Sequence, residues 1–493
     1  MEQPFEVIVI GGGGAGYAAA STAARLGRRV AMVERAELGG TCLNRGCVPS
    51  KTLIRSAEVL DTVRRAGEFG VAVADARLDY ARVVARKDAI IRGFSGEGPL
   101  ESLARQGIAL LRGSARFLDS HRLRVGEQVY RAERFVLCTG ARPRVPPLPG
   151  LAAAGYLTSD DALALTALPR SAIIVGGGII ACEFAPLWAI FGVAVTIVAE
   201  RLLPREEPEV DRTLAEEFAR RGIRLVRGRA ERVERQGAER IVYARTDAGP
   251  VATSAEVVLM ATGRQPNYAD LDLPAAGVAA TERGVQVDAT LRTSAPHVWA
   301  AGDVTGQHMY THAGDYAGEI AGWNAAGGRP PRQADFRVVP RPVFSFPQVG
   351  AVGLTERAAR EQGRAVETAQ VCYADISKAV IQGEPAGFCK LVADRDTGEI
   401  LGATLVGAQA AELISLVAVA MAGRVSAYTL GDTLLPYPTL PEIVRWTADQ
   451  IGKHLPPAEQ VRRAVGQPLH EICIGCWPER GAEQRAAEHR RAP

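Results

Sequence analysis

The chain has 493 residues, 58 Lys and Arg against 55 Asp and Glu, and a formal net charge of +3. At ~150 residues per domain this length predicts about three domains, and the near-neutral charge excludes a strongly basic nucleic-acid-binding protein. Hydrophobic residues make up 47% of the chain, which excludes global disorder, and aromatic residues only 6%, which argues against a base-stacking platform. We therefore expect a folded protein without nucleic acid as a partner.

The N-terminal segment has the pattern of a dinucleotide-binding unit. The apolar run Phe5–Ile10 leads into a glycine turn over 11–16, and a second apolar run, Arg29–Glu34, follows a helix of small residues. In such a turn Gly11, Gly13 and Gly16 permit the sharp bend, the close approach of a pyrophosphate, and close packing of helix on strand. Glu34 lies where an acid accepts hydrogen bonds from an adenosine ribose. The alternative is a glycine-rich turn without a ligand.

The start of the chain is not basic, so we expect no signal peptide and a cytoplasmic location.

The next segment carries two cysteines, Cys42 and Cys47, five residues apart. In a regular helix that spacing corresponds to ~7.5 Å along the axis, whereas a disulfide needs Cα atoms closer than ~7 Å. A bridge between them therefore requires a distorted turn, which Gly46 can provide. The following segment, Lys51–Val63, has helical character, and a helix N-terminus nearby favours a thiolate. Two unrelated buried thiols or half of a zinc site remain the alternatives.

The same strand–turn–helix pattern occurs a second time. Ser171–Val175 leads into the glycine turn Gly176–Ala181, and Val193–Ala199 is the next strand. A second sequence repeat supports this interpretation, because the apolar strands that end at Leu137–Gly140 and at Met260–Gly263 both finish with Thr-Gly. We therefore expect two bound nucleotides. Residues 171–199 contain one formal charge and mimic a membrane span, but the pattern favours a buried strand, helix and strand.

The sequence pattern changes in the rest of the chain. The run His297–Asp303 predicts a strand that returns to the first nucleotide domain. From about 336 onward, strands over Val343–Phe346, Phe388–Ala393 and Leu401–Val406 surround an apolar helix over Ala411–Ala422. This predicts an α+β domain. Residues 456–493 lose periodicity, and we expect a mobile tail.

These motifs together resemble the flavin-dependent pyridine nucleotide–disulfide oxidoreductases over about residues 5–450. The resemblance rests on Cys42 and Cys47 followed by Pro49-Ser-Lys51, both glycine units, Ala261–Arg264, and Ala301–Asp303. It implies an α/β fold with two Rossmann-like domains, FAD in the first and a nicotinamide coenzyme in the second, and a C-terminal α+β dimerisation domain that makes a homodimer. We predict the first part of the FAD domain over 1–150, the NAD(P) domain over 151–266, the second, central part of the FAD domain over 267–335, the dimerisation domain over 336–455, and a flexible tail over 456–493.

The resemblance also implies roles for individual residues. Asp303 should hold the ribityl chain, and Lys51 should lie near the flavin ring, paired with Glu183. Cys47 resembles the thiol that faces the flavin and Cys42 the thiol that meets the substrate. The cofactor-binding residues predicted for both nucleotides are Gly11, Gly13, Gly16, Glu34, Thr41, Lys51, Thr139, Gly140, Gly176, Gly178, Ala181, Glu200, Arg201, Gly263, Arg264, Asp303 and Thr311.

The second unit favours NADPH over NADH. The usual acid position for NADH is occupied by Ala199, and Arg201 and Arg205 are available for a 2′-phosphate. Ala181 at the third small position is similar to NADPH-using relatives. Glu200 is adjacent, however, and could serve a 2′-hydroxyl, so NADH stays possible.

Near the C-terminus the sequence departs from the pattern of lipoamide and glutathione reductases. These enzymes carry a His-Pro-Thr…Glu motif from the partner subunit, whereas this chain has Tyr437, followed by Pro438-Thr439 and then Glu442. A phenol, with an ordinary pKa of ~10, is a poor proton shuttle at neutral pH. Mercuric reductases resemble this chain in having tyrosine there.

The tail adds Cys473 and Cys476 beside His470, a group that suits soft metals, although incidental thiols are the alternative. We therefore predict a mercuric-reductase-like enzyme with Cys42, Cys47, Cys473 and Cys476 as metal ligands. The rival hypotheses are a dihydrolipoamide dehydrogenase or another disulfide reductase, and a redox-sensing or metal-binding flavoprotein. The predicted catalytic residues are Cys42, Cys47, Lys51, Glu183, Tyr437 and Glu442.

Overall fold

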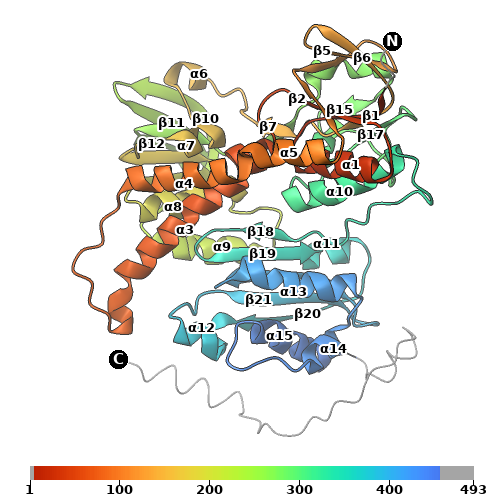
Figure 1. Ribbon diagram of the computed structural model, residues 1–493. Coiled ribbons are helices and arrows are strands. Elements are labelled where there is room, and N and C mark those ends of the chain that lie inside the picture. The colour runs from red at the N-terminus through yellow and green to blue at the C-terminus, as the bar shows by residue number, and fades with distance from the viewer. Residues whose placement is uncertain (1–4, 456–493) are drawn as a thin grey trace.

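The computed structural model describes residues 5–455, which form three larger sheets flanked by helices (Figure 1). Two sheets with their helices lie side by side at the top of the view, and the third lies below them. The predicted tail, 456–493, lies outside the described residues.

The first sheet is a mostly parallel dinucleotide-binding sheet, with the strand order β3-β2-β1-β6-β5-β4. An additional strand, β17, pairs in parallel with β6, so the chain near residue 300 returns to this sheet as expected. The strands are β1 (Phe5–Ile10), β2 (Val30–Glu34), β3 (Ala109–Arg112), β4 (Ala115–Phe117), β5 (Arg122–Val125), β6 (Gln128–Leu137) and β17 (Val298–Ala300). The helices of this part are α1 (Gly14–Arg25), α2 (Gly40–Arg45), α3 (Cys47–Arg64), α4 (Tyr80–Ser95), α5 (Glu97–Arg105) and α10 (Thr311–Ala325).

Helices α1 and α10 pack unusually closely because small residues line their contact. A Cβ added at Gly318 would lie 2.2 Å from the carbonyl oxygen of Ala15, and one added at Gly322 would lie 2.3 Å from that of Ala19. The backbones can therefore touch. This contact brings the N-terminus of α10 beside the glycine turn that precedes α1.

The second sheet repeats the arrangement, with the order β12-β11-β10-β9-β8-β13. Residues 171–199 form a strand, a short helix and a strand, as the pattern predicted, and none of the described helices is long and apolar enough to cross a membrane. The elements are α6 (Leu151–Ala154), α7 (Ser159–Ala164), β8 (Ser171–Val175), α8 (Ile179–Ile190), β9 (Ala194–Ala199), α9 (Pro208–Arg220), β10 (Arg224–Gln236), β11 (Glu239–Thr246), β12 (Gly249–Ala255) and β13 (Val257–Met260).

Short elements connect the two nucleotide sheets. Strand β7 (Ala141–Pro143) pairs with β14 (Arg264–Pro266), and β15 (Ala280–Thr281) pairs with β16 (Gly284–Val285). The 3₁₀ helices are η1 (Ala66–Phe69), η2 (Ala269–Leu271), η3 (Leu273–Ala276), η4 (Gly302–Thr305) and η5 (Tyr373–Asp375).

The third sheet is antiparallel, with the order β18-β19-β22-β21-β20. Its strands β21 and β22 are buried along their whole length. One face, with Leu391 and Leu405, packs under α13 and α15, and the other, with Val349 and Val406, packs against the core of the second nucleotide domain. The elements are β18 (Arg341–Val343), β19 (Gln348–Gly353), α11 (Glu356–Glu361), β20 (Val366–Cys372), α12 (Ser377–Ile381), β21 (Phe388–Asp394), β22 (Ile400–Gly407), α13 (Ala410–Ala422), α14 (Ala427–Asp432) and α15 (Glu442–Gly452).

One expectation for this domain needs correction. The predicted strand Val343–Phe346 is wrong, because β18 ends at Val343 and the amide of Phe344 donates a hydrogen bond to Glu183 (3.1 Å) instead of to a strand. The apolar helix, α13, is covered by its own sheet, apart from residues such as Val419, which is 70% exposed. The large exposed apolar side chains of this domain also include Leu434 and Tyr437.

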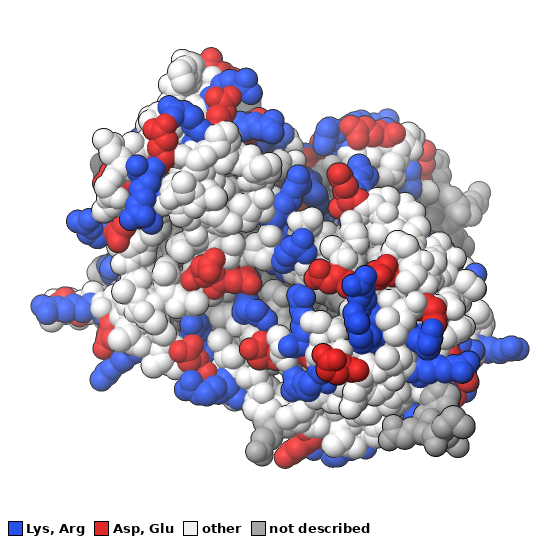
Figure 2. Space-filling view, turned by 90° about the horizontal axis from the view of Figure 1, so that it is seen from above, with Lys and Arg blue, Asp and Glu red and all other residues white. Residues whose placement is uncertain are grey.

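Charged side chains of both signs are interspersed over the face of the molecule seen from above (Figure 2). No large field of one sign dominates that view, in keeping with the near-neutral net charge.

Candidate active site

The two cysteines lie on either side of a break between two helices. Cys42 is in α2, and Cys47 is the first residue of α3. Gly46 separates the helices, and a Cβ at this position would lie 2.9 Å from the carbonyl oxygen of Thr41. The distorted turn expected at Gly46 is therefore present, although close packing, rather than a left-handed backbone, is what requires glycine there.

The two thiols differ electrostatically. A hydrogen bond from Cys42, with help from Thr311 and the positive charge of Lys51, lowers the pKa of Cys47 to about 6. The same hydrogen bond, together with burial, raises the pKa of Cys42 well above its usual range. The Sγ atom of Cys47 lies 3.4 Å from the hydroxyl of Thr311 at the start of α10. Cys47 is therefore the better thiolate, as the helix N-terminus also favours.

An ion pair connects α3 to the helix of the second nucleotide unit. Lys51 Nζ lies 2.8 Å from both carboxylate oxygens of Glu183, and Glu183 also accepts a hydrogen bond from the amide of Phe344. The ammonium group lies 4.7 Å from the centre of the Phe344 ring. The expected pairing of Lys51 and Glu183 is present, and it brings three parts of the chain together one turn from Cys47.

The first glycine turn has the geometry that a phosphate cradle needs. Gly11 has φ = +113°, and a Cβ there would lie 2.2 Å from the carbonyl oxygen of Cys138. A Cβ at Gly16 would lie 1.8 Å from the carbonyl oxygen of Gly11, so only glycine fits. Gly13 has no such neighbour within 3 Å, which leaves its backbone open to a ligand.

Glu34 holds the turn from the end of β2. Its carboxylate, 9% exposed, accepts hydrogen bonds of 2.7 Å from the amides of Gly12 and Ala36. A carboxylate has about four lone-pair sites, so acceptor capacity remains for ribose hydroxyls.

The other predicted cofactor residues lie near the ends of β6 and β17. Thr139 donates a hydrogen bond to the carbonyl of Asn267 (2.5 Å), and Gly140 has φ = +68°. Asp303 lies 3.5 Å from Arg264, and burial raises the pKa of its carboxyl group. Thr41 follows the Gly39-Gly40 turn at the start of α2.

Sequence reasoning missed one acidic residue here. Asp315 lies one turn after Thr311 on α10, and its Oδ1 is buried with no hydrogen-bond partner among the described residues. A Cβ on Gly14 would lie 2.1 Å from that atom, and burial raises the pKa of this carboxyl group. The glycine cradle fits a phosphate group and the unpartnered acceptor oxygen fits a hydroxyl donor, and FAD carries both. Only tertiary packing brings Asp315 to the glycine turn.

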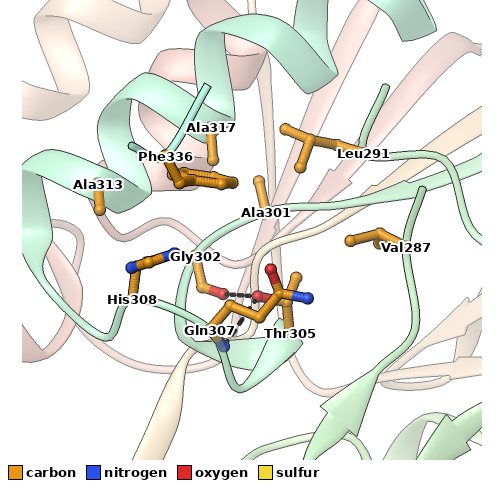
Figure 3. Close-up of a pocket in the computed structure, with 10 residues that line it drawn as sticks. All are labelled: Val287, Leu291, Ala301, Gly302, Thr305, Gln307, His308, Ala313, Ala317 and Phe336. Atoms are coloured by element: carbon orange, nitrogen blue, oxygen red, sulfur yellow. Dashed lines mark hydrogen bonds between the residues drawn. The ribbon is translucent and has the colours of Figure 1, made fainter. Parts of the chain in front are cut away.

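A small cavity lies behind the Gly302 turn (Figure 3). Its volume of about 10 Å³ is roughly the room that one water molecule needs. Its lining includes His308 stacked on Phe336, and the hydroxyl of Thr305, which donates a hydrogen bond to Gly302. The cavity is too small for a substrate, and its lining supports the turn that carries Asp303.

The second glycine turn repeats the first in detail. Gly176 also has φ = +113°, and a Cβ there would lie 2.4 Å from the carbonyl oxygen of Ala261. The amide of Gly11 donates to Val33 (2.8 Å), and that of Gly176 donates to Val198 (2.9 Å). Ala199 therefore occupies the place that Glu34 has in the first unit. Gly178 has nothing within 4 Å of a Cβ position. The remaining residues predicted to bind the coenzyme are Ala181, buried in α8, Glu200 and Arg201, both exposed after β9, and Gly263, with φ = +107°.

A third echo between the two units escaped the sequence analysis. Residues 107–115 and 222–230 share Gly, Ile, Leu, Arg, Gly and Ala at the same places. The first segment forms β3 and the second begins β10, each beside the second strand of its unit, with Arg112 opposite Glu34 and Arg227 opposite Ala199. Comparing the chain with itself strand by strand would have revealed this repeat.

Within one chain, Tyr437 and Glu442 belong to the far end of the dimerisation domain. Glu442 starts α15, which Figure 1 shows at the bottom of the view, away from the nucleotide domains. Its carboxylate accepts a hydrogen bond from the amide of Thr439 (2.9 Å). Tyr437 is 69% exposed, and its hydroxyl donates to Ser377 (3.2 Å).

The predicted tail ligands Cys473 and Cys476 lie outside the described residues. Within residues 5–455 no group of three or more His, Cys, Asp and Glu side chains is placed to hold a metal ion.

Comparisons with known proteins agree with this geometry. Residues 5–326 match the pyridine nucleotide-disulphide oxidoreductase family, and residues 339–448 match the dimerisation domain of that family. The chain belongs to this family.

Its relatives carry more than one function. A dihydrolipoyl dehydrogenase from Chlamydia muridarum is 34% identical over 95% of this chain and 99% of that protein. A mercuric reductase from Staphylococcus aureus is 34% identical over 90% of this chain and 82% of that protein. Among solved structures, the HOCl-induced flavoprotein disulfide reductase RclA from Escherichia coli matches with a TM-score of 0.80 and 30% identity, covering 90% of this chain and 99% of that one.

Membership of this family makes the protein an FAD-dependent oxidoreductase that uses NAD(P)H. The match to the dimerisation domain indicates a homodimer. The roles of individual site residues remain predictions.

Proposed function

We propose that this oxidoreductase passes electrons from NADPH to a thiophilic metal ion such as Hg(II), through FAD and the Cys42–Cys47 pair. NADPH loses a hydride, the metal ion gains two electrons and becomes the metal, and one proton is released. Of the cofactors, FAD supplies the ring that accepts the hydride and passes electrons to the cysteines.

The observation that carries this proposal is Tyr437. Disulfide substrates leave as thiols and need protons, which an imidazole delivers well at neutral pH. This position holds an exposed tyrosine whose hydroxyl is already donated to Ser377. A metal ion held by two thiolates needs no such proton, so tyrosine is compatible with metal reduction.

The cysteine pair suits soft metals. Cys47 is held as the thiolate at the first turn of α3, while Cys42 keeps its proton until a metal displaces it. Lys51 is held near Cys47 because Glu183 binds its ammonium group with both carboxylate oxygens. A relative offers further support, since a solved structure of RclA is a Cu(II) complex.

The test is metal-dependent oxidation of NADPH by the holoenzyme, with Hg(II) in excess thiol. We expect turnover with Hg(II), loss of about three orders of magnitude in Cys42→Ser, and full activity in Cys372→Ser. Cys372 is an exposed cysteine at the end of β20 and serves as the control. Turnover with lipoamide and none with Hg(II) would contradict the proposal; turnover with neither, with tight metal binding, would favour a sensor.

A second candidate is dihydrolipoyl dehydrogenase activity. It is favoured by the Chlamydia relative, of which this chain covers 99%. If Tyr437 is what excludes disulfide substrates, Tyr437→His should raise lipoamide-dependent turnover at least tenfold and leave binding of FAD unchanged. Equal lipoamide turnover in both proteins would remove Tyr437 as the determinant.

We also propose that the two subunits share their active sites. Glu442 begins α15, and Tyr437 precedes it, at the end of the dimerisation domain that lies away from the nucleotide domains (Figure 1), so we expect them to act on the partner's pair. Mixing Cys42→Ser and Glu442→Gln protomers should produce heterodimers with one intact site and restore part of the activity. A fully active monomer would defeat the idea.

Cys473 and Cys476 are proposed to pass the metal ion to Cys42 and Cys47. The double variant Cys473→Ala/Cys476→Ala should lose turnover strongly when small thiols bind Hg(II) tightly, because ligand exchange then needs an attacking thiolate. With weakly complexed metal it should lose little. Wild-type activity under both conditions would remove the tail from the mechanism.

A further inference from the structure

A hollow of about 270 Å³ lies in the second nucleotide domain, at the carboxyl end of β9 and beside the part of β10 where its parallel pairing with β9 ends. Seven residues line it: Glu200, Arg227, Gly228, Arg229, Arg245, Thr246 and Asp247. In sheets of this kind nucleotides bind outside the carboxyl ends of the parallel strands. Neither Arg201 nor Arg205, the arginines expected to bind the 2′-phosphate, is among the lining residues. Arg205 instead lies near Tyr310, where its positive charge opposes the rise in the pKa of Tyr310 that burial causes.

The two nucleotide units provide an internal comparison at this point. The matching backbone hydrogen bonds of Gly11 and Gly176 place Ala199 where the first unit has Glu34. The third echo places Arg229 where the first unit has Ser114. From the first unit to the second, a buried carboxylate is therefore lost at the end of the second strand, and a guanidinium is gained two residues further along the neighbouring strand.

The arginines of the hollow stand in an arrangement that costs stability without an anion. Arg229 lies directly opposite Arg245 across the β10–β11 pair, and like charges so placed repel each other. Arg245 is partly compensated by Glu231 (3.1 Å), and Arg227 by Asp211 (2.6 Å). Arg229 has no hydrogen-bond or ion-pair partner among the described residues, so its guanidinium is the one of the three that is free to bind an anion.

We infer that Arg229 is the residue that pairs with the 2′-phosphate of NADPH. The coenzyme unit has Arg229 and Ala199 where the FAD unit has Ser114 and Glu34, and these two differences distinguish the units. FAD carries a free 2′-hydroxyl on its adenosine, which suits the carboxylate of Glu34, whereas a 2′-phosphate would be repelled by a carboxylate and attracted by a guanidinium. The inference rests on the proposed use of NADPH and names the residue that selects it.

Glu200 opposes this selection, since its carboxylate also lines the hollow. It follows the last residue of β9 and is exposed, and the side chain of Arg227 contacts its backbone carbonyl (3.3 Å) rather than its carboxylate. The carboxylate can therefore turn toward water. Replacing it should strengthen binding of a 2′-phosphate only slightly.

The test measures binding of adenosine 2′,5′-bisphosphate and of 5′-AMP to the FAD-loaded protein by calorimetry. Arg229→Ser should weaken binding of the bisphosphate about tenfold and that of 5′-AMP less than twofold. Arg229→Lys keeps the charge and should lose less. Arg224→Ser is the matched control, because Arg224 is an exposed arginine at the amino end of the same strand, with no partner among the described residues.

The double variant Ala199→Glu/Arg229→Ser rebuilds the first unit's pattern and should reverse the preference between NADPH and NADH in reduction of the bound flavin. Equal weakening of both probes by Arg229→Ser, no weakening, or the same loss in Arg224→Ser would overturn the inference. No external electron acceptor is added, so the outcome is independent of whether a metal ion is the substrate. A wild-type protein that binds both probes equally would reject the proposed use of NADPH itself.

Discussion

The two nucleotide units of this chain share a glycine turn, the order of their parallel strands and a repeated third strand. They differ in how closely the residues around the turn pack. In the first unit, Gly16 has no room for a Cβ, and the buried carboxylate of Glu34 joins two loop amides. In the second, Ala181 takes the place of Gly16, and Ala199 that of Glu34.

This difference matches the two ligands that the family uses. FAD remains bound through many turnovers, so its site can be closed, whereas a nicotinamide coenzyme must enter and leave its site in each cycle. The second unit keeps the turn but omits the carboxylate that ties the loop, and its hollow stays open at the carboxyl end of β9, beside β10. A shared motif therefore indicates that a nucleotide binds, while the residues around the motif set how tightly it is enclosed.

The strongest test of this comparison exchanges the third small residue of each turn. Gly16→Ala should weaken binding of FAD more than about hundredfold, because the new Cβ would lie 1.8 Å from the carbonyl oxygen of Gly11 and the turn must open. Ala181→Gly should change the KM for NADPH by less than about threefold. FAD content after purification and coenzyme titration measure the two effects. A Gly16→Ala protein that retains FAD would show that the first cradle is not tighter.

A second test concerns the ion pair that joins the two units. Lys51→Met should lower the free energy of unfolding by about 2 kcal/mol, because Glu183 is left buried without its cation, and partial exposure of Lys51 limits the loss. Urea denaturation of the holoprotein measures it. The double variant Lys51→Met/Glu183→Gln should recover part of the loss, since no uncompensated carboxylate remains. Additive losses would mean that the pair does not join the units energetically.

The reactivity of Cys47 with pH examines the first unit by itself. Because the pKa of Cys47 is lowered to about 6, its thiolate persists at neutral pH and is lost as the pH falls through about 6. Alkylation of the reduced protein should therefore slow about tenfold between pH 7 and pH 5, with Cys47 modified before Cys42. Mass spectrometry of the labelled peptides identifies the site. First labelling at Cys42 in the apoprotein, where no flavin covers Cys47, would show that Cys47 is not the better thiolate.

The smallest expected effects come from the acids at the ends of the second strands. Glu34→Gln should weaken binding of FAD about fivefold, since an amide keeps one acceptor but loses the charge and the second acceptor for a loop amide. Glu200→Gln should change the KM for either coenzyme less than about threefold. Fluorescence titration of the apoprotein with FAD measures the first effect. Equal effects at the two positions would remove the distinction between a tied and an open loop.

Local patterns predicted the features that depend on neighbours in the chain. The glycine turns need φ = +113° at Gly11 and Gly176, a property of the residue type, and the break at Gly46 follows from the spacing of the two cysteines. The sequence predicted strands close to β21 and β22 but not what covers each of their faces. Strands β21 and β22 are buried on both faces because the nucleotide domains cover one face and helices cover the other.

By itself, then, the sequence determined the two nucleotide units, the cysteine pair and the family, because turns, strand patterns and short spacings are set by the residues themselves. Only the tertiary structure placed Asp315 against Gly14 and Arg229 opposite Arg245. Each of these contacts joins residues from different elements, and α10 reaches the first glycine turn nearly 300 residues after it. Such contacts depend on helix packing and strand register, which arise when distant apolar faces are buried together, and no local pattern records them.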